Sequence, residues 1–192
     1  MLNFKKNQNM KQIQLLGLAY LFFSLFACGQ TAQKKTEKET ENGWKALSEP
    51  NYFIQYPESW DLDKSGQMGM SLILLSKLST QQDQFRENVN LLIQDLQGQN
   101  INLDKYVEIS EGQIKTMITN GNLIESKRLI ENEFEFQKVI YTGDQGVYKL
   151  KFEQYYWIKN GKAYVLTLTC ELEQFEKYKV NGEKILNSFR LK

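Results

Sequence analysis

The sequence predicts an α+β domain with helices on both faces of a mostly antiparallel sheet. Strand-like segments are followed by a helix, four further strand-like segments joined by short turns, and a final helix. Successive hairpins in this order favour antiparallel strands over a parallel, doubly wound sheet. Several strands are apolar at consecutive positions, which is typical of strands covered on both faces.

Residues 1–27 have the features of a cleaved lipoprotein signal peptide. Lys5, Lys6 and Lys11 precede a 15-residue apolar run, Ile13–Ala27. This run is shorter than the ~20 residues that a membrane-spanning helix needs. Leu25-Phe26-Ala27-Cys28 then resembles a lipobox, with small Ala27 just before the cysteine. Two alternatives stay open: a secretory signal that ends in a cysteine by chance, and a start at Met10.

Cys28 is therefore the expected lipid attachment site, acylated on its sulfur and on its new amine. Two or more acyl chains give stable membrane anchoring. We expect a bacterial cell-envelope location with the membrane as a partner through Cys28. Gly29 follows the cysteine in place of the aspartate that is associated with inner-membrane retention in some bacteria, which favours the outer membrane.

Residues 28–43 are expected to form a disordered tether. Between Gly29 and Gly43 there is no aromatic or branched aliphatic residue, so the segment cannot bury enough surface to fold. As a coil, these 15 residues would average ~20 Å from end to end.

Residues 44–192 are expected to form one globular domain. Apolar residues recur at helical spacing from Leu103 to Ile118, where Asn102 can cap the helix and Asn120-Gly121 can end it. A second helix runs from Phe175 to Phe189. Gly182 inside it costs up to ~1 kcal/mol relative to alanine, so the helix can kink or break there. A short helical turn is expected around Asp83–Phe85. The expected strands are Tyr52–Tyr56, Leu72–Leu75, Val89–Ile93, Leu123–Ile130, Phe134–Tyr141, Val147–Ile158 and Ala163–Cys170.

The last hairpin can be closed in two registers. A two-residue Asn160-Gly161 turn pairs Ile158 with Ala163, whereas a three-residue loop, Lys159 to Gly161, aligns the apolar residues of the two strands more completely. A slip of one residue moves every side chain to the other face. The apolar pattern therefore predicts the three-residue loop, with Gly161 at a bulge.

Charge and residue types exclude several classes of function. Removal of the three signal lysines leaves 21 basic and 23 acidic residues, so there is no basic surplus to bind nucleic acid. The chain has no histidine, which excludes Ser-His and Cys-His nucleophiles and histidine-based zinc sites. If Cys28 carries lipid, Cys170 has no disulfide partner, and its apolar setting predicts a buried, inert thiol.

Acidic residues are the remaining candidates for metal binding. Glu131, Glu133 and Glu135 could bind calcium, but they lack the alternating ligands and glycine of a calcium loop, and a solvated turn fits better. The same holds for Asp61 and Asp63. We therefore expect no metal, no cofactor and no catalytic residue.

Tyr155 and Trp157 are the candidate partner-binding residues. They share a face with Lys149, Lys151 and Glu153, opposite the apolar face of the same strand. If no helix covers that face, the two aromatic rings form an exposed patch of the kind that contacts partner proteins. The alternative is that a helix packs over them.

Three stretches of the domain resemble the PsbP-like superfamily, and in particular small bacterial envelope lipoproteins of the DcrB-like type. They are Phe53–Trp60, Glu87–Ile93, and Phe175–Tyr178 with Ile185–Phe189. The resemblance covers about Trp44 to Lys192. It implies an α/β/α sandwich around an antiparallel sheet and a role as an accessory or binding subunit. No functional residue can be carried over, because the matching positions are framework positions.

Three functions remain. The first is a lipid-anchored, non-catalytic accessory or binding module with a protein partner in the envelope. The second is a carrier or chaperone for a small apolar ligand, which requires a closed cavity. The third is an enzyme, which requires paired, buried carboxylates in a cleft.

Overall fold

The computed structural model describes residues 38–40, 43–131 and 134–192. The predicted signal peptide (1–27), Cys28 and the first part of the predicted tether lie outside the described residues. Among the described residues, no helix is long and apolar enough to cross a membrane.

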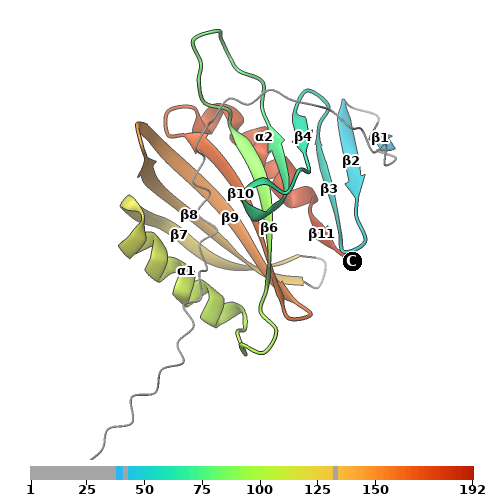
Figure 1. Ribbon diagram of the computed structural model, residues 1–192, viewed down its shortest axis with the longest axis vertical. Coiled ribbons are helices and arrows are strands. Elements are labelled where there is room, and N and C mark those ends of the chain that lie inside the picture. Colours follow the sequence, from blue (N-terminus) through green and yellow to red (C-terminus); the bar gives the residue numbers. More distant parts are fainter. Residues whose placement is uncertain (1–37, 41–42, 132–133) are drawn as a thin grey trace, which may run out of the picture.

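A seven-stranded antiparallel sheet forms the centre of the domain (Figure 1). The expectation of a mostly antiparallel sheet is confirmed, because each neighbouring pair is antiparallel. In spatial order its strands are β4 (Asp61–Asp63), β5 (Met70–Leu75), β6 (Asn88–Asp95), β10 (Lys162–Glu171), β9 (Tyr148–Lys159), β8 (Phe134–Gln145) and β7 (Thr119–Glu131). A short 3₁₀ turn, η1 (Gln67–Gly69), precedes β5.

A smaller, four-stranded sheet lies beside the large one. Its order is β1 (Lys38–Thr40), β2 (Trp44–Ser48), β3 (Tyr52–Pro57) and β11 (Arg190–Leu191). The short strands β1, β2, β4 and β11 were not among the expected ones. β1 falls inside the segment expected to be a disordered tether: its three residues pair with β2, from Thr40 with Trp44 to Lys38 with Ala46. A polar composition prevents burial in a core, but it leaves the backbone able to pair at a sheet edge.

Helix α1 (Leu103–Met117) covers one face of the large sheet. Asn102 caps it as expected, since its side-chain oxygen accepts a hydrogen bond from Lys105 N at 2.9 Å. Tyr106 packs edge-on against Tyr156 of β9, with ring centroids 5.5 Å apart. The helix ends at Met117, with Ile118 as its C-cap. Asn120 has a positive φ of 53°, and Gly121 N donates to Ile118 O at 3.0 Å, so the Asn-Gly pair turns the chain out of the helix as expected, and the pairing of β7 with β8 is interrupted there.

Helix α2 (Phe175–Ser188) covers the opposite face. Its buried residues Phe175, Ile185 and Leu186 share a core with Leu168 of β10 and with the inner face of the small sheet. Figure 1 shows the two helices on different parts of the sheet, with α2 close to β10 and α1 beside β7 and β8. Helices on both faces are therefore confirmed.

The last hairpin has the two-residue turn, so the predicted three-residue loop is wrong. Ile158 pairs with Ala163, and Lys159 with Lys162. Asn160 and Gly161 both have positive φ, 52° and 69°, which is the type I′ turn that Asn-Gly favours. Both faces of β9 and β10 are buried, so apolar residues are needed on both, and their pattern cannot select a register.

The predicted helical turn is also wrong, and helix α2 has no break. Asp83–Phe85 is not a helical turn: the Asp83 carboxylate accepts hydrogen bonds from Ser79 N and Phe85 N, which holds an irregular loop. Helix α2 continues through Gly182 without a break. Gly182 is where the helix approaches β10 most closely, since a Cβ atom there would lie 2.4 Å from Leu168 Cδ2.

We predict opposite effects for alanine at the two helical glycines. Gly182→Ala should destabilise the domain by about 1–2 kcal/mol, because overpacking against Leu168 exceeds the gain of ~1 kcal/mol in helix propensity. Gly112→Ala, on the exposed side of α1 with nothing within 4 Å, should stabilise it by up to ~1 kcal/mol. Thermal melts of the two variants test this, and equal stabilisation by both would contradict the close approach.

Candidate functional site

The structure places Tyr155 and Trp157 under helix α2. They are only 3% and 6% exposed. The Trp157 ring lies 4.9 Å from the Phe189 ring and 5.2 Å from the Phe136 ring, and Tyr155 Oη donates to Asn187 Oδ1 at 3.0 Å. The prediction of an exposed aromatic patch is therefore wrong, and the alternative, a covering helix, is correct. These side chains hold α2 on the sheet.

A narrow hollow remains beside these rings. It is lined by aromatic residues of β8 and β9, by the end of α2 and by β11. Its volume is about 20 Å³, which is room for a single water molecule. A small apolar ligand of the kind that a carrier encloses does not fit there.

The α2 face of the sheet also holds a buried ion pair. Glu153 of β9 is fully buried, and Lys138 Nζ lies 2.7 Å from Glu153 Oε1 and 3.6 Å from Glu183 Oε1 of α2. Burial alone would lower the pKa of Lys138, but its hydrogen bond and attraction to Glu153, with Glu183, outweigh this and raise it. Lys138 thus links the sheet to the helix.

A second buried carboxylate, Glu87, lies just before β6. Burial raises its pKa, while its hydrogen bonds to its own backbone, to Ser76 and to Tyr178 act in the opposite direction. β10 lies between β6 and β9, so Glu87 and Glu153 are two strand spacings, about 10 Å, apart across the sheet. The register also offsets them by two residues along the strands, because Asn88 pairs with Thr169 and Glu153 with Leu168. They do not form the paired carboxylates that an acid–base site would need.

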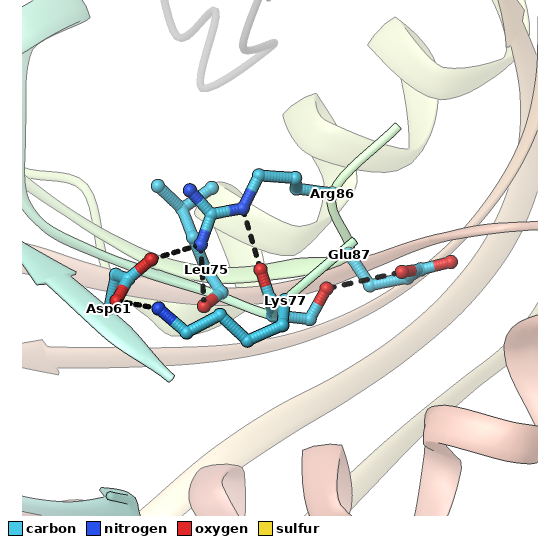
Figure 2. Close-up of polar contacts among 6 residues, drawn as sticks. Asp61, Leu75, Lys77, Arg86 and Glu87 are labelled. Atoms are coloured by element: carbon cyan, nitrogen blue, oxygen red, sulfur yellow. Dashed lines mark hydrogen bonds and ion pairs between the residues drawn. The ribbon is translucent and has the colours of Figure 1, made fainter. Parts of the chain in front are cut away.

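The loop Ser76–Glu87, between β5 and β6, is closed at its base by a polar network (Figure 2). Ser76 N donates to Glu87 O at 2.8 Å, which joins the two ends of the loop. The Arg86 guanidinium donates to the carbonyls of Ser76 (2.6 Å) and Leu75 (3.2 Å) and to Asp61 Oδ2 (2.5 Å). Lys77 also binds Asp61, and the two cations hold the pKa of Asp61 below its usual value, with the Lys77 hydrogen bond as the largest cause.

The inside of the loop is fixed as well. Asp83 accepts from Ser79 N at 2.9 Å and from Phe85 N at 3.1 Å. Phe85 is buried, and its ring lies 5.1 Å from that of Tyr148 at the start of β9. Ser79 Oγ hydrogen-bonds to Tyr178 Oη of α2 at 3.1 Å. Compact loops with joined ends that are packed by their own side chains are frequently functional.

This loop borders an open depression of about 550 Å³. Its other walls are the turn between β8 and β9 and the segment that leads into α2. It is lined by Ser79, Thr80, Gln82, Asp83, Gln84, Val147, Tyr148, Glu171, Gln174 and Lys177. We call the loop Ser76–Glu87, the turn Gly146–Val147 and the segment Glu171–Lys177 together the loop pole.

The loop pole combines exposed apolar side chains with acidic ones. Val147 is 90% exposed, and Leu78 and Leu172 are almost half exposed. Partial burial, then Asp83 and Glu173, raise the pKa of Glu171, so these three carboxylates lie close enough to repel one another. Apolar residues around an open, polar depression are suited to contact with another macromolecule.

Sequence reasoning missed this site because the loop carries no periodic pattern. A signal was nevertheless present: twelve residues between two central antiparallel strands are far more than a tight hairpin needs, and long loops in compact domains are often functional. A single aromatic residue, Phe85, in an otherwise polar stretch also indicated a loop anchored to the core.

The candidate calcium ligands are used in ion pairs. Arg190 contacts Glu131 at 3.0 Å, and Arg128 contacts Glu135 at 3.0 Å, while Glu133 lies outside the described residues. Within residues 38–40, 43–131 and 134–192, no three acidic or cysteine side chains gather as metal ligands. Cys170 is buried, as predicted, and burial raises the pKa of its thiol.

Comparison with known proteins identifies the fold of this chain. The sequence matches no protein-family profile and no curated protein sequence. Among solved structures, the cyanobacterial PsbP protein CyanoP of Synechocystis has a TM-score of 0.59 at 16% identity, over 88% of this chain and 99% of that one.

Two further structures are similar. LpqN of Mycobacterium tuberculosis, a protein involved in cell envelope biogenesis, has a TM-score of 0.56 at 10% identity, over 77% of this chain and 90% of its own. PA94 of Pseudomonas aeruginosa has a TM-score of 0.53 at 11% identity, over 77% and 96%. The chain therefore has a PsbP-like α+β fold, as its sequence resemblance implied. The narrower resemblance to DcrB-like lipoproteins stays a prediction.

We predict that Tyr155→Ser with Trp157→Ser severely destabilises the domain. Loss of a buried large aromatic side chain costs about 3–5 kcal/mol, and here two support one helix. The matched control, Val147→Ser with Ile130→Ser, changes exposed residues and should cost less than about 1 kcal/mol in total. Thermal melts of both double variants test this prediction. If the variant at Tyr155 and Trp157 melted at the same temperature as the control, this would contradict the observed burial.

Proposed function

We propose that this protein is a non-catalytic accessory module of the bacterial cell envelope, anchored through Cys28, that binds a protein partner at the loop pole. One observation carries the proposal: the loop Ser76–Glu87 is held in one shape by Arg86, Asp83 and Phe85, yet it exposes Leu78 beside an open depression, and the neighbouring segments of the loop pole expose Val147 and Leu172. A surface that is ordered before binding loses little conformational entropy when it binds.

The geometry supports this function better than the two alternatives. A carrier needs an enclosed apolar cavity, whereas the depression at the loop pole is open and polar, and the hollow beside Trp157 has room for only one water molecule. An enzyme needs converging acid–base groups. Here Glu87 and Glu153 are separated by β10, and Glu153 is paired with Lys138 of β8, which also contacts Glu183 of α2.

Two observations support the envelope location. The first is the lipobox and the polar residues that follow it in the sequence. The second is the similarity in fold to LpqN, a protein involved in cell envelope biogenesis. Gly29 after the cysteine supports the outer membrane over the inner one.

The first test concerns the anchor. The mature protein should begin at an acylated Cys28 and sediment with membranes, and Cys28→Ala should release it into the soluble fraction because its acyl chains are lost. Cys170→Ala, which removes the other cysteine, should leave the protein in the membrane fraction. Intact-mass measurement that finds residues 1–27 still attached would reject the lipobox.

The second test concerns the surface. Replacing Leu78, Val147 and Leu172 with serine should reduce chemical crosslinking to the partner in native envelopes about tenfold, because a combined loss of about 1.4 kcal/mol over the three apolar contacts is enough for that change. The control replaces Ile124, Ile130 and Val180, which are exposed elsewhere on the domain, with serine.

Both triple variants should melt within a few degrees of the parent protein, because none of the six side chains is buried. Equal crosslinking by the two variants would reject the loop pole as the binding surface.

A further inference from the structure

The chain enters the domain at the loop pole. Gly43 O accepts from Glu58 N at 2.9 Å, and Trp44 pairs with Pro57, so the start of β2 lies beside the end of β3. From there contacts lead directly to the loop. The Trp60 ring lies 6.5 Å from that of Tyr178, and Tyr178 binds Ser79.

The strand register gives the same result independently. Asp61 begins β4 and pairs with Leu75, the last residue of β5 before the loop, and Asp61 also binds Arg86 at the loop's other end (Figure 2). The opposite end of the domain carries the last pair of β7 and β8, Glu131 with Phe134, the hairpin turn after Lys159, and the last residue, Lys192. Ile130, 75% exposed, marks that distal end.

The length of the preceding segment decides which end faces the membrane. Nine residues lie between Cys28 and Lys38, where β1 begins, so ten Cα–Cα steps separate the two. As the coil that its composition predicts, this segment averages about 17 Å and reaches at most about 36 Å. β1 pairs along β2, so Lys38 lies beside Ala46, only about 7 Å from the level of Trp44. The twelve residues of β9 span about 40 Å.

These lengths favour one orientation. If the distal end faced the bilayer, the tether would have to run back along about 30 Å of the domain, close to its full extension. With the loop pole towards the bilayer, the tether keeps its relaxed length. The entropic penalty for extending a coil almost fully disfavours the first orientation.

We propose that the loop pole faces the membrane that holds Cys28, and that its partner is a protein embedded in that same membrane. This inference rests on the proposed function, that is, on the anchor at Cys28 and on binding at the loop pole. The lipid surface itself is a poor partner, because Asp83, Glu171 and Glu173 would repel anionic lipids and the domain has no basic surplus. A membrane protein's exposed segment can supply apolar contacts to Leu78, Val147 and Leu172.

The experiment uses a photo-crosslinking residue in the full chain in living cells. It replaces Val147 at the loop pole, or Ile130 at the distal end as the matched control. Each protein is made with the native tether and with 80 Gly/Ser residues inserted after Gln33. The average height of the domain above the membrane grows with the square root of tether length, so the insertion should reduce the time that the pole spends at the membrane about threefold.

We expect Val147→p-benzoylphenylalanine to crosslink to an integral membrane protein that resists alkaline extraction, with a yield about threefold lower in the long-tether protein. Ile130→p-benzoylphenylalanine should crosslink weakly with either tether. Two results at Val147 would overturn the inference and leave the binding surface standing. One is a product that contains lipid only. The other is a crosslink to a soluble or wall-bound protein whose yield is unchanged or higher with the long tether. Absence of any product at Val147 with either tether would reject the proposed function as well.

Discussion

Burial of the central sheet on both faces is the constraint on which the rest of this structure depends. β9 and β10 contribute apolar side chains to α1 on one face and to α2 and the small sheet on the other. Neither core could form without the other, because a strand with one apolar face left in water would lose a large part of its burial free energy. The two helices are therefore linked energetically through the backbone of the same strands.

The core beneath α2 contains polar side chains as well as apolar ones. Glu153 and Lys138 lie among aromatic rings, and Asn187 of α2 accepts a hydrogen bond from Tyr155. A buried ion pair of this kind contributes little net stability, but removing one partner leaves an uncompensated charge. Lys138 also contacts Glu183 of α2 at 3.6 Å, so the same lysine links the pair to the helix. Gly182 acts in the same direction by letting the helix backbone come close to Leu168. Position and spacing of the helix are thus set by polar and steric contacts, while its attachment comes from apolar burial.

The loop pole depends on this arrangement. Tyr178 of α2 contacts both Trp60 and Ser79, so the placement of α2 determines one wall of the depression and helps to hold the loop. The other support is Asp61, which binds Lys77 and Arg86 near the two ends of the loop. Solvent-exposed ion pairs are individually weak. Here Arg86 also satisfies two backbone carbonyls, so the network supplies hydrogen bonds that a long, irregular segment would otherwise lack. The chain also enters β2 at this end of the domain, beside the end of β3, so the proposed binding surface lies near the point where the preceding segment joins the domain.

The sequence alone determined the class of the fold, the seven longest strands, both helices with the Asn102 cap, and the burial of Cys170. These depend on local signals: periodicity, capping and turn residues. It did not determine the register of the last hairpin, the burial of Tyr155 and Trp157, the role of Gly182 or the shape of the loop Ser76–Glu87. Each of these is decided by contacts between residues far apart in the chain. Alternating polarity identifies a core face only when the other face meets water, and β9 and β10 have no such face. Lys149, Lys151 and Glu153 therefore suggested a solvated surface, whereas in the folded protein Lys151 lies 4.0 Å from the Phe175 ring and Glu153 binds Lys138 beneath α2. Only the tertiary structure could show which polar groups find partners inside, because a charge pairs with whatever the fold places beside it.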